Sequence, residues 1–219
     1  MRFVVAIDGT AASGKGTIGK AVSKHYNFSY LDTGLLYRAV AFNLRCFAPA
    51  SDLNIISKKN TLRAIEAINS NILELDELRS SEISEMASLI ATNSYVRENL
   101  LSYQRSFANQ KGGAVLDGRD IGTVVCPDAD VKIFVDAMES VRAKRRMDQF
   151  EKQNLKMSYP EVLSNLKKRD EQDRNRTIAP MLPSKDSLIL DTSRMSVQES
   201  LDIVISRINT ELKKITLNS

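Results

Sequence analysis

The chain has 219 residues, 42% of them hydrophobic and 26% charged, and is therefore long and apolar enough to bury one substantial core. Lysine and arginine outnumber aspartate and glutamate by only 31 to 27, an excess too small to indicate a nucleic-acid partner. No apolar run approaches the roughly 18 residues of a membrane span, and charge appears too early for a signal peptide, so we expect one soluble, cytoplasmic domain with no membrane partner.

Short β-branched runs alternate with longer amphipathic stretches, which is typical of βα units around a parallel sheet. Continuous apolar runs predict five strands covered on both faces, at residues 3–7, 28–31, 114–116, 131–135 and 188–190. Amphipathic stretches predict helices at residues 15–26, 34–47, 95–110, 138–153, 159–173 and 197–214. The sequence therefore predicts an α/β fold in which helices flank a parallel five-stranded sheet.

Residues 48–93 interrupt this rhythm with serine, asparagine, glutamate and scattered isoleucine and leucine. A structureless loop of that length is uncommon inside a compact domain. We therefore expect an inserted subdomain between the second and third of the predicted helices.

The strongest motif lies between the first strand and the first helix. It consists of Gly9, Thr10, Ala11, Ala12, Ser13, Gly14, Lys15, Gly16 and Thr17. This is the context of a phosphate-binding loop, in which glycines let backbone amides point inward and the helix N-terminus favours a polyphosphate. Lys15 would reach the β/γ-phosphates and Thr17 would serve phosphate or magnesium. A chance surface turn is the alternative, and the position between strand and helix disfavours it.

Polar segments also follow the second and third strands, at residues 31–38 and 116–123. Ligands of open parallel sheets bind at the carboxyl ends of the strands, so both segments should face the phosphate loop. Arg38 and Arg119 would converge there, and the planar guanidinium suits bidentate phosphate binding. Asp117 ends an apolar run and is a candidate for holding magnesium or its water, although a turn-forming Asp-Gly pair is the alternative.

A third set lies near the end of the basic segment 142–176. Arg169, Asp173 and Arg176 are spaced i, i+4 and i+7, so a helix that continues this far would present them on one face. An exposed ion-pair ladder is the ordinary explanation of such spacing. A substrate-contacting face becomes credible beside the other two arginine motifs.

Other chemistries have little support. Cys46 and Cys126 have no metal-ligand spacing, and we expect both to be buried thiols. The only histidine is His25, late in the first predicted helix. A nucleoside monophosphate is largely a dianion at neutral pH, with a second pKa of about 6, and needs no general base, so phosphoryl transfer to it would need arginines rather than histidine.

With these segments in order, the chain resembles the bacterial cytidylate kinases over nearly its whole length. The matching pieces are residues 7–17, 31–39, 96–97, 117–125 and 168–176. The resemblance implies a P-loop NTPase fold and ATP-dependent, magnesium-assisted phosphorylation of CMP and dCMP to CDP and dCDP in pyrimidine metabolism. Thr10 and Ala11 depart from the Pro-Ser common in the family, and Cys126 replaces a residue that is often aromatic.

The resemblance also implies residue roles. The loop of residues 9–17 would hold the ATP phosphates, and the acceptor would be bound by Thr33, Arg38, Arg97, Arg119, Asp120, Arg169, Asp173 and Arg176. Within that set, Arg38 and Arg119 would hold the acceptor phosphate, while Thr33, Arg97 and Asp120 would help to read the cytosine. The catalytic groups would be Lys15, Arg119, Arg145 and Arg146, and the metal residues Thr17 and Asp117.

The implied organisation is a single kinase domain, expected to be a monomer. Its core would comprise residues 1–33, 111–140 and 177–219, its monophosphate-binding region residues 34–110, and its mobile lid residues 141–157. Three alternatives stay open at this point. The first is a sister kinase for UMP, AMP or dTMP. The second is a regulatory or nucleic-acid-binding P-loop protein that uses ATP as a switch, and the third is a nucleotide-binding fold that has lost its activity.

Overall fold

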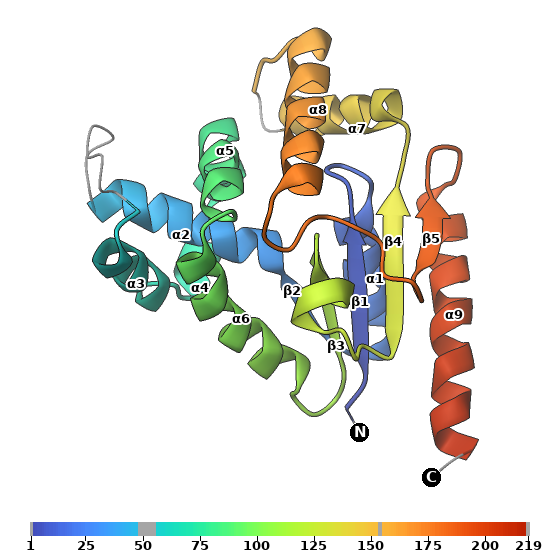
Figure 1. The fold of residues 1–219 in the computed structure, drawn as a ribbon. Helices are drawn as coiled ribbons and strands as arrows, with labels where there is room; N and C mark the ends of the chain where they lie inside the picture. Colours follow the sequence, from blue (N-terminus) through green and yellow to red (C-terminus); the bar gives the residue numbers. More distant parts are fainter. Residues whose placement is uncertain (1, 48–55, 153–154, 218–219) are drawn as a thin grey trace.

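The computed structural model describes residues 2–47, 56–152 and 155–217. In these ranges, five parallel strands form one sheet in the order β2-β3-β1-β4-β5, which confirms the predicted α/β fold (Figure 1). The strands are β1 (Val4–Gly9), β2 (Ser29–Asp32), β3 (Ala114–Gly118), β4 (Val131–Asp136) and β5 (Leu188–Asp191). Each of the five strand predictions falls on one of them, with ends displaced by one or two residues.

The register of the sheet sets the position of the site. Asp32 at the end of β2 pairs with Asp117 on β3, and Asp8 on β1 pairs with Gly118. The strand ends that carry the predicted motifs are therefore level with one another. The phosphate loop leaves β1 at this same carboxyl edge.

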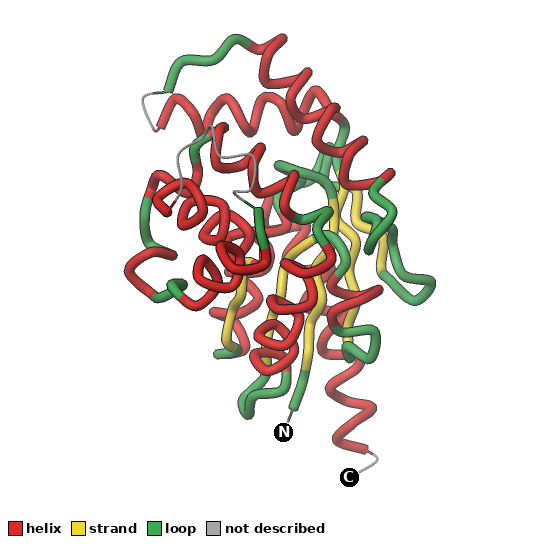
Figure 2. Tube along the Cα trace, turned by 60° about the vertical axis from the view of Figure 1, so that its left-hand side comes forward, coloured by secondary structure: helices red, strands yellow, loops and turns green. Residues whose placement is uncertain are grey.

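Helices cover both faces of the sheet because β1 alternates between two apolar clusters (Figures 1 and 2). Val5 and Ile7 pack with α1 (Lys15–Tyr26) and α9 (Val197–Leu217). Val4 and Ala6 pack with α2 (Thr33–Phe47) and α6 (Ser94–Ala108) on the other face. All six residues of β1 are buried, so this strand is a rigid support for whatever follows it.

The region between α2 and α6 is helical over its described part, residues 56–93. It contains α3 (Lys58–Glu66), α4 (Ser70–Leu73), a 3₁₀ turn (Asp76–Arg79) and α5 (Ser81–Ile90). Its serines and asparagines are helix caps: Ser57, Asn69, Ser80 and Asn93 each accept a backbone N–H in a first turn. The polar composition that interrupts the βα rhythm therefore marks a series of short capped helices.

Two further helices, α7 (Glu139–Lys152) and α8 (Tyr159–Asn175), pack against each other above the carboxyl edge of the sheet (Figure 1). Ala143 and Phe150 of α7 form an apolar cluster with Val162 and Leu166 of α8. Ala11 of the phosphate loop belongs to the same cluster. The predicted end of the first of these helices, residue 153, lies outside the described residues.

One cysteine prediction is wrong. Cys126 is buried, but Cys46 is exposed near the end of α2. The inward stripe of α2 includes Leu36, Val40 and Leu44, and Cys46 lies off that stripe. Within the described ranges, no helix has the length and apolarity required to cross a membrane.

Candidate active site

The phosphate loop joins β1 to α1 with the backbone that a tight anion cradle requires. Gly9 has φ 147°, and a Cβ there would lie 1.9 Å from the carbonyl oxygen of Val135, so no other residue fits. Gly14, immediately before α1, has φ 97°. The glycines thus bend the chain so that the N-terminus of α1 faces the carboxyl edge of the sheet.

Side chains inside the loop fix its shape. Thr10 Oγ1 donates to Asp136 Oδ1 at 2.7 Å, and Ser13 Oγ donates to the Thr10 carbonyl at 3.0 Å. Lys15 Nζ donates to the same carbonyl at 3.3 Å, so its ammonium lies over the loop. Thr10, a departure from the family pattern, thereby ties the loop to the end of β4.

Two cavities open beside the loop. The larger, of about 670 Å³, is lined by residues 11–18 and by six arginines, namely Arg38, Arg79, Arg119, Arg145, Arg146 and Arg169. The smaller, of about 150 Å³, is lined by predicted acceptor residues and Asp117, namely Thr33, Arg38, Arg97, Asp117, Arg119, Asp120, Arg169, Asp173 and Arg176. The cationic side chains that line both are Lys15, Arg38, Arg119 and Arg169. Of the site residues predicted from sequence, Gly9 and Thr10 line neither cavity.

A chain of ion pairs forms the wall of the smaller cavity. Asp120 pairs with Arg97 and also, at 2.9 Å, with Arg176. Asp173 Oδ2 accepts from Arg119 Nε at 2.8 Å, and Asp173 Oδ1 lies 3.9 Å from Arg176 Nη1. Both carboxylates are buried, and each is compensated by two guanidinium groups. The charges are therefore held in place before a ligand binds.

Two arginines at the cavity boundary lack such compensation. Among the described residues, Arg38 Nε and Arg169 Nε are buried without a hydrogen-bond partner. Burial, then the neighbouring Arg119 and Arg38, lower the pKa of Arg169. Buried guanidinium groups that repel one another form a site for an anion of high charge, because such an anion would satisfy the open donors and relieve the repulsion.

Acidic groups lie opposite these arginines. Burial and the neighbouring Asp32 raise the pKa of Asp117 to about 6, against the opposing effect of Lys15. The Tyr30 hydroxyl donates a hydrogen bond to Asp117 Oδ2. A Cβ at Gly16 would lie 3.3 Å from that oxygen, so the glycine that replaces the more common Ser or Thr after Lys15 leaves room for the carboxylate.

A sequence model for cytidylate kinase matches residues 5–210 of the chain. The chain belongs to the cytidylate kinase family. It is 44% identical over 208 residues to the cytidylate kinase of Cereibacter sphaeroides strain KD131, an alignment that covers 95% of this chain and 96% of that protein. It is 46% identical over 198 residues to the cytidylate kinase of Brucella suis biovar 1, covering 90% of this chain and 88% of that protein.

The structural likeness is more distant and concerns the fold alone. A gluconokinase from Sinorhizobium meliloti 1021 superposes with a TM-score of 0.51 at 12% identity, covering 100% of this chain and 98% of that one. This likeness shows a shared fold, whereas the cytidylate kinase family is assigned by sequence.

Two arginines of the predicted lid have different surroundings in this member of the cytidylate kinase family. Arg145 donates to the Ser13 carbonyl at 3.1 Å, and to the hydroxyl and carbonyl of Thr192 at 2.9 and 2.8 Å. Arg146 instead lies over the Phe150 ring at 4.4 Å and donates to Gln149 Oε1 at 3.0 Å. Arg145 is therefore bonded to the phosphate loop and to Thr192, while Arg146 has N–H donors left for a ligand.

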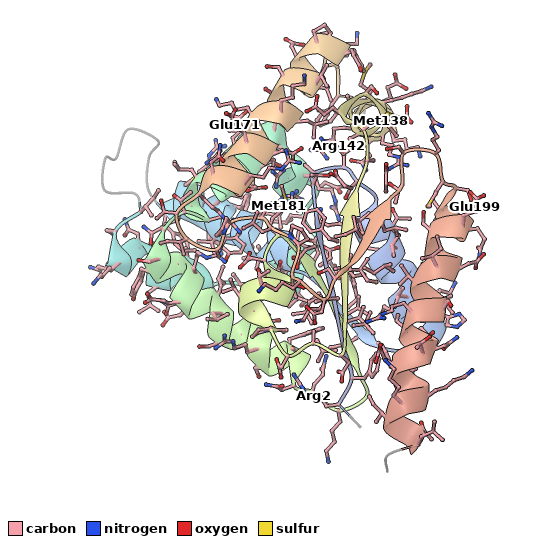
Figure 3. All side chains as sticks on the ribbon, turned by 45° about the vertical axis from the view of Figure 1, so that its right-hand side comes forward. Arg2, Met138, Arg142, Glu171, Met181 and Glu199 are labelled. Carbon is pink, nitrogen blue, oxygen red and sulfur yellow. The ribbon has the colours of Figure 1, made fainter. Side chains whose placement is uncertain are left out.

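Sequence reasoning missed a buried pair that joins the lid helices to the loop. Arg142, which Figure 3 labels, lies on α7. It pairs with Asp170 on α8, and both residues are almost fully buried. Arg142 Nη1 donates to the Ala11 carbonyl at 3.1 Å, and Asp170 Oδ1 accepts from the Ala11 amide at 3.1 Å. Both polar groups of one loop residue are thus held by this pair. The available signal was Asp170 itself, which lies beside Arg169 within the matching segment 168–176.

Proposed function

We propose that this protein transfers the γ-phosphoryl group of ATP to CMP and dCMP. The observation that carries the proposal is the boundary shared by the two cavities, where Lys15, Arg38, Arg119 and Arg169 gather beside the phosphate loop. One polyphosphate and one monophosphate bound on either side would bring donor and acceptor together. Membership of the cytidylate kinase family favours the cytosine nucleotides over UMP, AMP and dTMP as acceptors.

Catalysis would rest on position and charge. Phosphoryl transfer requires stabilisation of the equatorial phosphoryl oxygens rather than covalent chemistry by the protein. Lys15 and Arg119 would contact the transferring group, and Arg146 would approach it from α7. The unpaired Nε atoms of Arg38 and Arg169 would bind the acceptor phosphate. Excluding water between the cavities would favour CMP over water as the acceptor.

Recognition of the base would use the buried ion-pair chain. Asp120 can accept from the exocyclic amine of cytosine, and Arg97 can donate to its ring nitrogen and carbonyl. Thr33 Oγ1 donates to the Asp117 carbonyl at 2.7 Å, so it keeps an acceptor lone pair for the base. Arg176 and Asp173 would contact the ribose or hold Arg119. The hydroxyl at the 2′ position would be of secondary importance, so both CMP and dCMP are substrates.

Magnesium would bind between the carboxylates and the phosphates. Asp32, Asp117 and the exposed Thr17 hydroxyl provide the hard oxygen ligands that Mg²⁺ prefers. The described residues contain no cluster of three or more His, Cys, Asp or Glu side chains that could hold a metal. We therefore propose that phosphate oxygens and water would supply most of the Mg²⁺ ligands. The bound ion would neutralise part of the phosphate charge.

We further propose that residues 34–110 move with the acceptor and that residues 141–157, of which 153–154 lie outside the described part, act as the lid over the core. In support, α5 of the first region contacts α8, which follows the lid, and Ser88 of α5 and Arg169 of α8 both line the acceptor cavity, so movement of either region would change that cavity. A single chain contains all the residues of both cavities, which supports a monomer as the active unit.

The test is a coupled ADP-release assay with CMP, dCMP, UMP, AMP and dTMP at equal concentrations. CMP and dCMP should give the highest kcat/KM, and activity should require magnesium. A Lys15→Ala preparation purified in parallel measures any contaminating kinase. A preference for UMP, AMP or dTMP would reject the substrate assignment while leaving the kinase fold intact.

A further inference from the structure

Asp8, the last β1 residue before Gly9, is buried and has no part in the chemistry described above. Its side chain points to the other half of the site: Oδ1 accepts from the Ile121 amide and Oδ2 from the Gly122 amide, both at 2.7 Å. These are two successive amides of the segment that begins with Arg119 and Asp120. One carboxylate therefore links the strand that carries the phosphate loop to the segment that carries the acceptor-binding side chains.

We propose that Asp8 is a positioning residue for the acceptor nucleotide, because it holds the backbone of Ile121 and Gly122 and thereby sets where Arg119 and Asp120 stand. The inference rests on the proposed function, since it assigns Asp8 to the CMP side of that reaction. Asp8 itself would touch neither nucleotide. Its effect would pass through the segment that it holds.

The surrounding backbone supports this role. Residues Ile121–Val125 form a single π-helical turn, and the Val124 and Val125 amides both donate to the Asp120 carbonyl. That turn is short and irregular. Arg105 of α6 holds its far end through the Val125 and Val124 carbonyls, at 3.0 and 3.1 Å. β1 is paired on both sides and buried throughout. Asp8 thus attaches the near end of the turn, next to Arg119 and Asp120, to a central buried strand.

Keeping a carboxylate at this place opposes folding. Burial raises the pKa of Asp8 to about 7, against the two amide bonds, with Asp120 adding to the rise and Arg119 opposing it. The pKa in the unfolded chain is lower, so the contribution of Asp8 to stability declines as pH rises from about 4 to about 7. Cys126, whose own pKa is raised by burial, also interacts with Asp8. A neutral side chain would avoid this cost, but it could accept from only one of the two amides, so the charged form is the one that holds both.

The experiment compares Asp8→Asn with a matched control, Asp130→Asn. Asp130 Oδ2 also accepts a β1 amide, that of Val4 at 2.7 Å, but at the opposite end of the strand. For Asp8→Asn at pH 8 we expect KM for CMP to rise about tenfold, as for one lost charge-assisted bond, with KM for ATP within about twofold. Asp130→Asn should leave both KM values unchanged and lower Tm.

A second readout is pH. Protonated Asp8 would lose one amide bond, so the ratio of wild-type to Asp8→Asn affinity for CMP should fall as pH drops from 8 to 6, with the titration of CMP itself cancelling in the ratio. Asp8→Ser, too small to clash with the two amides, replaces the Asn variant if that one does not fold.

Equal rises in both KM values, an unchanged KM for CMP, or the same effect in Asp130→Asn would overturn the inference. These outcomes are distinct from failure of the proposed function, which would appear as a wild-type enzyme inactive on CMP.

Discussion

The phosphate loop and the acceptor cavity meet at Lys15 but are built in different ways. The loop is contiguous, residues 9–17, and its turns follow from glycine backbone angles and bonds within a few positions of one another. Three distant side chains, those of Asp136, Arg142 and Asp170, then hold it from outside. The acceptor cavity draws its side chains from β2, α2, β3, α6 and α8, joined by ion pairs that span up to 56 positions. Damage to the loop should therefore be local, whereas damage to one acceptor residue should spread to its ion-pair partners.

Lys15→Ala tests the boundary between the two regions and should have the largest effect. We expect kcat to fall by ~10³-fold or more, the size associated with transition-state phosphate contacts. Burial and Arg119 lower the pKa of Lys15 to about 7, with Asp117 and Asp32 opposing, so bound phosphate should restore its proton. Steady-state turnover under saturating ATP and CMP measures the change. Turnover within tenfold of wild type would remove Lys15 from the catalytic set, and Lys24→Ala on the same helix is the control.

Arg142→Ala asks whether the loop is as local as its sequence suggests. Removing one member of a buried pair leaves Asp170 uncompensated, which typically costs about 3–5 kcal/mol of unfolding free energy. The Ala11 carbonyl would also lose its donor, so KM for ATP should rise more than KM for CMP. Urea unfolding and initial rates measure the two effects.

Arg142→Lys is the matched variant. It keeps the charge but cannot donate to Asp170, Ala11 and Ala137 at once, so it should show the same KM pattern with a smaller loss of stability. Unchanged KM for ATP in either folded variant would mean that the loop holds its own shape.

Asp173→Ala tests whether damage spreads in the acceptor cavity. Arg119 and Arg169 lower the pKa of Asp173 although burial would raise it, and Asp173 in turn holds Arg119 Nε. Losing this charge-assisted bond, worth about 1.5–3 kcal/mol, should raise KM for CMP about tenfold or more and KM for ATP little. Initial rates with each substrate varied in turn measure it. Asp173→Asn, which still offers an oxygen to Arg119, should lie between the alanine variant and wild type. An equal rise for both substrates would reject the acceptor-side role.

The same contrast explains what the sequence could predict. The loop and the strands that precede the three motifs were predictable because their signals are contiguous, and the α8 face because helical spacing alone places Arg169 and Asp173 together. The partners in the buried ion pairs were not predictable, because the basic segment 142–176 does not indicate which of its Arg and Lys side chains turn inward. Arg142 does so, and Arg145 binds the carbonyls of Ser13 and Thr192 instead of standing free, because of how α7 packs on the sheet edge. The role of Asp8 likewise depends on a turn 113 positions away.

An exposed pair between the same two helices should have the smallest effect. Lys167 Nζ on α8 lies 2.9 Å from Glu139 Oε2 on α7, and these two side chains are 55% and 49% exposed. The side chains of Arg142 and Asp170 are only 3% and 4% exposed. Solvent screens such a pair, and a double-mutant cycle should give a coupling of about 0.2–1 kcal/mol, with both KM values unchanged. If Lys167→Ala altered KM for ATP as Arg142→Ala does, the position of α8 as a whole, rather than its contact with Ala11, would control the loop. The two pairs join the same helices, so the difference between them isolates burial and the bond to the loop as the cause.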